Sequence, residues 1–215
     1  GEVLKDTEDK KIESDALVLL AARYRAITAR SRDDLKESLR MLDDLKGKGW
    51  KYTSDLDEEE WTEIDYRRGL ILTDLGRLSE ARKAMEDSLA AGGNDVSWLF
   101  GYAAILMQME EYDQAISWFL KALTFVPDDV GILYRIGWCY KLKGEYEEAL
   151  SYMKKVLELD AGHQGVRMVI VELYERLARR KEDNAYYHLA LPYMQEQVKM
   201  YPEEYYRMEM GLLYL

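Results

Sequence analysis

The chain has 215 residues, a formal net charge of −11, and 48% hydrophobic against 33% charged residues. This composition is typical of an ordered protein rather than a disordered one. So acidic a chain repels phosphate backbones, which argues against nucleic-acid binding. The longest apolar run, residues 98–107, is too short to span a bilayer. A single cysteine excludes an intramolecular disulfide and favours a reducing compartment.

The first part of the chain predicts a flexible N-terminus over residues 1–13 and a helical hairpin with a connector over residues 14–57. An apolar stripe at helical spacing marks each helix of the hairpin: Leu17, Leu20, Tyr24 and Ile27 in the first, Leu35, Leu39, Leu42 and Leu45 in the second. We expect both stripes to face the core. The hairpin turn is too short for the repeats that follow, so the hairpin is interpreted as a divergent repeat or an N-terminal cap.

A 34-residue pattern begins at Thr62. Four series of positions recur at this spacing: Gly69, Ala103 and Gly137; Ala81, Ala115 and Ala149; Leu72, Leu106 and Tyr140; and Met85, Phe119 and Met153. The small residues would let two helices approach closely, and Gly76 and Gly144 fall at the turn between helices. This period is typical of a helix–turn–helix repeat. We predict three units within residues 58–163, at 62–95, 96–129 and 130–163.

Residues 164–215 predict a divergent fourth unit and a last partial helix. Its second helix lies 41 rather than 34 residues after the equivalent positions, an insertion of 41 − 34 = 7 residues. We expect the extra residues in a charged connector, residues 179–184, and we expect Pro192 near the first turn of its helix. The apolar end at residues 212–215 is interpreted as the end of one domain of a longer chain, with self-association through the C-terminal helix as the alternative.

At these positions the chain resembles the tetratricopeptide-repeat family. One unit carries the pattern on Leu133, Ile136, Gly137, Tyr140, Ala149 and Met153, and the unit before it on Leu99, Tyr102, Ala103, Leu106, Ala115, Phe119, Ala122 and Pro127. The unit at 62–95 is weaker, because Asp65 and Arg68 replace apolar residues. The resemblance implies an all-α, right-handed superhelical solenoid of antiparallel helix pairs, forming a single domain.

The family's first helices line a concave groove that binds peptides, and the resemblance implies the same use here. The expected peptide- or partner-binding residues are Tyr66, Arg67, Phe100, Tyr134, Arg135, Trp138, Lys141 and Arg176. Aromatic residues and arginine dominate binding hot spots, so we expect an extended peptide with apolar and acidic side chains. The alternative for each aromatic residue is simple packing between neighbouring units.

Catalysis is not expected, because no set of residues in the chain has the spacing of an active site or a metal site. His163 and His188 lie in different units, and Cys139 has no histidine beside it in the repeat frame. We therefore predict no cofactor, and a scaffold or adaptor that binds a protein or peptide. The alternatives are a structural or oligomerisation module and a regulatory domain of a larger protein. The predicted location is cytoplasmic, or exported with a signal peptide removed, since the chain starts at Gly1.

Overall fold

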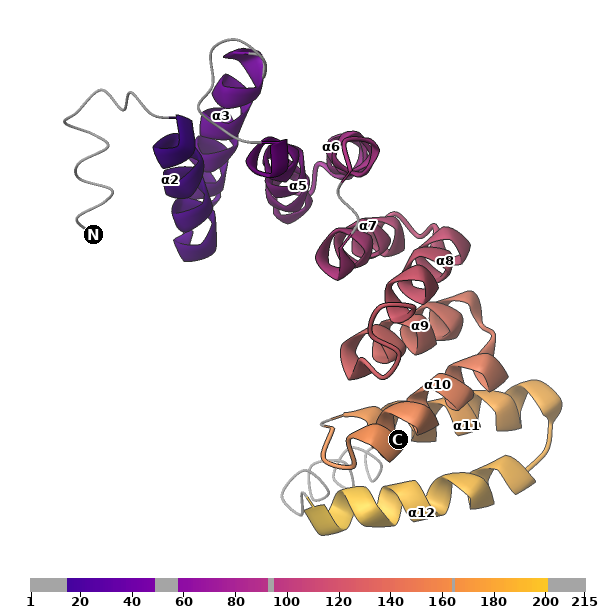
Figure 1. Cartoon of the computed structure of the whole chain (residues 1–215). Helices are drawn as coiled ribbons and strands as arrows, with labels where there is room; N and C mark the ends of the chain where they lie inside the picture. The colour runs from indigo at the N-terminus through magenta and orange to yellow at the C-terminus, as the bar shows by residue number, and fades with distance from the viewer. Residues whose placement is uncertain (1–14, 49–57, 93–94, 164, 201–215) are drawn as a thin grey trace. The chain divides into compact units, whose positions relative to one another are not determined.

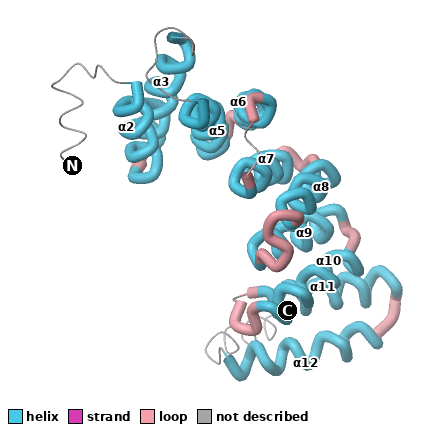
Figure 2. The backbone as a smooth tube through the Cα atoms, in the orientation of Figure 1, coloured by secondary structure: helices cyan, strands magenta, loops and turns pink. Residues whose placement is uncertain are grey.

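A computed structural model describes residues 15–48, 58–92, 95–163 and 165–200 of the chain, and these residues contain ten helices and no strand (Figures 1 and 2). The helices are α2 (Asp15–Thr28), α3 (Arg32–Lys48), α5 (Glu58–Asp74), α6 (Leu78–Ala90), α7 (Val96–Gln108), α8 (Tyr112–Leu123), α9 (Val130–Lys143), α10 (Tyr146–Leu159), α11 (Val166–Lys181) and α12 (Ala185–Met200). The all-α prediction is confirmed. The chain divides into two compact units with their boundary between Trp118 and Phe119, inside α8.

Unit 1 is built from helix pairs in chain order. α2 packs on α3, α3 on α5, α5 on α6, and α6 on α7. Three of the four residues of the predicted stripe on α3, Leu39, Leu42 and Leu45, are buried, and Leu35 is half-buried. The predicted stripe on α2 is wrong: α2 buries Leu19, Ala21 and Ala22 and leaves Leu20, Tyr24 and Ile27 exposed. This helix is apolar on two faces, so spacing does not select between them, and the alanines allow the closer approach to a neighbour.

The polar residues of the weakest repeat have a structural explanation. Arg68 of α5 donates to Asp43 of α3 at 2.7 Å and to Asp65 at 2.8 Å, and Lys46 of α3 donates to Asp65 at 2.6 Å. These side chains replace apolar repeat positions because α5 packs on the divergent hairpin. Hydrogen bonds in a partly buried ion network satisfy groups that an apolar partner would leave unpaired.

The recurring alanines and large apolar residues occupy buried positions, as their 34-residue spacing predicts. Ala81, Ala115 and Ala149 are fully buried, and so are Met85, Phe119 and Met153. A Cβ atom added at Gly137 would lie 3.0 Å from Met153 and 3.1 Å from Tyr152, closer than side chains normally pack. Close approach of α9 and α10 therefore depends on the absence of a side chain at this position.

Turns and caps also repeat. Gly76, Glu110 and Gly144 lie 34 residues apart and all have a positive φ, of 76°, 63° and 81°. Asp95 and Asp129, also 34 apart, cap α7 and α9 with their side chains: Asp95 accepts from the backbone N–H groups of Ser97 and Trp98, and Asp129 from that of Ile132. Caps of this kind satisfy backbone donors that have no partner inside the helix.

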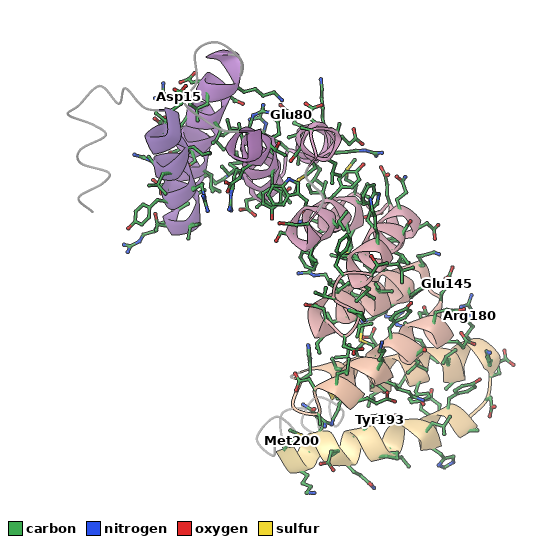
Figure 3. The ribbon with its side chains drawn as sticks, viewed as in Figure 1. Asp15, Glu80, Glu145, Arg180, Tyr193 and Met200 are labelled. Carbon is green, nitrogen blue, oxygen red and sulfur yellow. The ribbon has the colours of Figure 1, made fainter. Side chains whose placement is uncertain are left out.

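Unit 2 corrects two expectations about the divergent fourth repeat. Half of the predicted connector at residues 179–184 is helical, because α11 continues to Lys181 and only residues 182–184 join it to α12. Three basic residues, 179–181, occupy the last turn of α11, where the helix dipole favours positive charge. Arg180 also donates to the Gly144 carbonyl at 2.6 Å, next to Glu145 (Figure 3).

Pro192 lies in the middle of α12 rather than in its first turn. A proline removes one intrahelical hydrogen bond, yet α12 continues to Met200. Ala190 is buried on this helix, and the rings of Tyr186 and Tyr193 pack at a tilt against Tyr174 of α11, with 6.5 Å and 6.1 Å between centroids. Tertiary packing therefore holds the helix across the proline. Expectations for residues 1–13, the connector at 50–57 and the segment after Pro202 lie outside the described residues. Over the residues described, no helix is long and apolar enough to cross a membrane.

Candidate binding site

The eight predicted binding residues divide between the two units. Tyr66 and Arg67 lie on α5 and Phe100 on α7, all in unit 1. The remaining residues belong to unit 2, where α9 carries Tyr134, Arg135, Trp138 and Lys141, and α11 carries Arg176.

In unit 1, Tyr66 is a packing residue. Its ring stacks on Trp98 of α7, with 4.3 Å between centroids and 21° between planes, and only 9% of Tyr66 is exposed. Burial raises the pKa of Tyr66. The Arg67 guanidinium lies 5.5 Å from the Tyr66 ring centroid. For Tyr66, the structure thus supports the alternative of packing between neighbouring helices over exposure to a ligand.

Trp98, which is not among the predicted binding residues, is hydrogen-bonded to a buried serine. Its indole N–H donates to the Ser88 hydroxyl at 2.5 Å, and Ser88 donates to the Thr62 carbonyl at 3.0 Å. This chain of hydrogen bonds joins α5, α6 and α7. Ser88 falls 34 residues before Ala122 and 68 before Val156, so a polar residue at an apolar repeat position was the available signal.

The predicted basic binding residue of unit 1, Arg67, is already paired. Arg67 donates to Glu63 at 2.7 Å, and Arg23 of α2 lies 3.2 Å from the same carboxylate oxygen. The Glu63 side chain is only 15% exposed. One carboxylate is therefore shared by two cations, and one of them, Arg67, adjoins the Tyr66 ring.

In unit 2, three rings form an aromatic row consisting of Tyr134, Trp138 and His163. Tyr134 stacks on Trp138 with 5.8 Å between centroids and on His163 with 5.3 Å, at interplanar angles of 28° and 22°. Tyr134 and Trp138 are half-buried and pack against the core of the unit. Burial raises the pKa of Tyr134. His163 comes from the loop before α11, so sequence spacing along the first helices did not reveal it.

An ion triad consisting of Lys141, Glu172 and Arg176 adjoins the aromatic row. The Lys141 ammonium lies 4.3 Å from the Trp138 ring centroid and donates to Glu172 at 2.5 Å. Arg176 donates to the other oxygen of Glu172 through Nε at 3.1 Å and Nη2 at 3.0 Å. Burial alone would raise the pKa of Glu172, but hydrogen bonds from Lys141 and Arg176 outweigh it and lower this pKa.

Chemistry at the remaining candidate residues is limited. Cys139 is fully buried, and this burial raises the pKa of its thiol to about 11, which suppresses the nucleophilic thiolate. Within the part of the chain that the structure describes, no group of three or more His, Cys, Asp or Glu side chains could hold a metal ion.

Comparison with known families assigns the centre of the chain. Residues 95–161, which cover α7 to α10, match the family model described as tetratricopeptide repeat. This segment consists of tetratricopeptide repeats. The matched segment contains both capping aspartates and two of the three residues of the aromatic row, Tyr134 and Trp138. The tetratricopeptide repeats therefore form the scaffold that carries these two rings.

Solved tetratricopeptide-repeat structures share the fold. YrrB, described as a TPR protein with an unusual peptide-binding site, has a TM-score of 0.67 at 18% identity, over 98% of each chain. MamA from Desulfovibrio magneticus RS-1 has a TM-score of 0.65 at 19% identity, over 85% of this chain and 94% of that one. Another MamA crystal structure has a TM-score of 0.64 at 17% identity, covering 86% and 95%. No curated protein sequence matches the chain. At these identities the likeness extends to the fold alone.

Proposed function

We propose that this chain is a non-catalytic interaction protein that binds a peptide, or an extended segment of a partner protein, on the aromatic row of unit 2. The observation that carries the proposal is Tyr134, which stacks on both Trp138 and His163 while remaining half-exposed. Large rigid side chains that are anchored on a core and open to solvent provide contact area at low entropic cost.

Two further observations support binding at this row. α9 begins with an aspartate cap and ends at Gly144 in the left-handed conformation, so both ends of the helix that carries Tyr134 and Trp138 are fixed. YrrB, which shares the fold, is described as having a peptide-binding site. Arg135 remains a proposed binding residue of this surface on unit 2, whereas Tyr66, Arg67 and Phe100 remain predicted binding residues of unit 1.

The test is affinity capture from source-cell extract with three versions of the chain. Replacing Tyr134 and Trp138 by alanine should abolish capture of the partner. The matched control replaces Leu142 and Leu159, two exposed apolar residues of unit 2, and should retain it. Circular dichroism should show the same helical content for all three chains. Equal capture by the Tyr134/Trp138 variant and the wild type would refute the proposal.

A second candidate function is self-association through α12. Tyr187 and Leu191 are 41% and 46% exposed, and they align at helical spacing with the half-buried Met194 and Val198. An exposed apolar stripe of this kind favours contact with another copy. Sedimentation velocity should show a concentration-dependent dimer that disappears when Tyr187 and Leu191 are replaced by serine. A monomer at all concentrations would exclude this function.

A further inference from the structure

In the ion triad of unit 2, the carboxylate of Glu172 binds two cations as the carboxylate of an acidic ligand would. Both oxygens of Glu172 are used, one by Lys141 and the other by Arg176. Two nitrogens of one arginine and the ammonium of a lysine are donors of the kind that recognise carboxylates in protein complexes. In this chain, however, the carboxylate belongs to the protein itself.

Glu172 is not explained by repeat packing. It lies 34 residues after Trp138, 68 after Ala104 and 102 after Leu70, and those three positions carry apolar side chains. Glu172 is 37% exposed, whereas its partner Lys141 is only 12% exposed. The carboxylate therefore lies at the solvent side of the pair, where a competing group can reach it.

The arrangement also has a counterpart in unit 1, in a different register. Glu63 pairs with Arg67, whose guanidinium adjoins the Tyr66 ring, and with Arg23. Each unit thus has an aromatic ring, a cation beside the ring, a carboxylate that holds this cation, and a second cation on the same carboxylate. A pairing that appears in both units argues against an accidental surface ion pair, which would contribute little.

We propose that Glu172 is an internal competitor for acidic ligands, which occupies Lys141 and Arg176 until a ligand carboxylate displaces it. This inference rests on the proposed function, because it concerns peptides bound on the adjoining aromatic row. It reverses one expectation from the sequence: with Glu172 in place, the surface selects peptides by their apolar side chains and disfavours acidic ones. Removing Glu172 exposes two cations and makes acidic peptides the preferred ligands.

The experiment uses a random dodecapeptide library displayed on phage, selected against the full chain. Three versions are compared: wild type, Glu172→Gln, and the control Glu158→Gln, which removes the same charge from an exposed position on α10 of the same unit. Peptides selected on Glu172→Gln should be enriched in Asp and Glu relative to the other two pools. One such acidic peptide should bind Glu172→Gln roughly tenfold more tightly than wild type or Glu158→Gln, as one charge-assisted hydrogen bond would give.

Two further variants distinguish a failure of this inference from a failure of the proposed function. Adding Lys141→Gln and Arg176→Gln to Glu172→Gln should remove the gain, because the cations that bind the acidic peptide are then absent. Equal affinity of the acidic peptide for wild type and Glu172→Gln overturns the inference. Selected peptides should also lose binding to Trp138→Ala. If they bind Trp138→Ala unchanged, or if no version selects any peptide, the proposed function fails as well; if they need Trp138 but ignore Glu172, only this inference fails.

Discussion

Replacing Glu110 by glycine should stabilise unit 1. Glu110 has a φ of 63° at the turn between α7 and α8, the position where Gly76 and Gly144 stand in the neighbouring repeats. A residue with a Cβ atom pays roughly 1–2 kcal/mol for the left-handed conformation. Glycine avoids this cost but loses more chain entropy on folding, roughly 0.5–1 kcal/mol. The net expected gain in the free energy of unfolding is therefore about 0.5–1 kcal/mol.

Urea denaturation followed by circular dichroism measures this gain. The control Glu110→Ala removes the same carboxylate from a chain of net charge −11 but keeps a Cβ atom, so relief of charge repulsion appears in both variants. The reciprocal change, Gly76→Ala, should destabilise unit 1 by about 1 kcal/mol. A Cβ atom at Gly76 would meet nothing within 4 Å, so the loss would come from the backbone alone. If Glu110→Gly is no more stable than Glu110→Ala, the backbone-strain argument is refuted.

Three other predictions concern buried polar groups. Ser88→Ala should lower the free energy of unfolding, measured in urea, by about 1–2 kcal/mol, because the Trp98 indole N–H loses its acceptor. In a Trp98→Phe background the same substitution should cost less, by at least roughly 0.5 kcal/mol. Equal costs in the two backgrounds would contradict the hydrogen bond. Cys139, whose pKa burial raises to about 11, should react with a disulfide reagent at pH 8 roughly 100-fold more slowly in the folded chain than in urea; equal rates would place the thiol at the surface. Burial, together with a hydrogen bond to Glu86, raises the pKa of Tyr102 to about 12. The unfolded chain therefore loses this proton at lower pH than the folded one, and stability should fall between pH 10 and pH 12. Tyr102→Phe should show a shallower fall over that interval, and an unchanged slope would argue against the shift.

The repeat architecture was predictable because its determinants are local. Alanines 81, 115 and 149 and the large residues Met85, Phe119 and Met153 recur every 34 residues, and all six are buried. Each repeat packs mainly on its neighbours, so one period in the sequence corresponds to one helix pair in space. The same locality explains why α7 and α9 begin at Val96 and Val130, the residues at which the predicted units begin.

The sequence-based predictions were wrong where one local pattern is compatible with two different structures. α2 has apolar residues on opposite faces, and its contacts with α3 and α5 decide that Leu19 and Ala22 are buried rather than Leu20 and Ile27. The charged residues 179–181 resemble a connector in sequence, yet they extend α11 because Arg180 and Lys181 bind the turn and first residues of α10. Distant partners override local preference in both cases.

Most helices, their pairing, the 34-residue repeat and the aromatic and basic residues of the candidate site other than His163 were predictable from the sequence. Which of those residues are covered, and which are already paired, depends on the tertiary structure. Tyr66 is covered by Trp98, while Tyr134 remains half-exposed beside His163. Lys141 and Arg176 are both bound to Glu172, which lies 31 residues from Lys141 in the chain. Periodicity specifies which face a residue occupies, but the partner it meets there depends on side chains brought from other helices and loops.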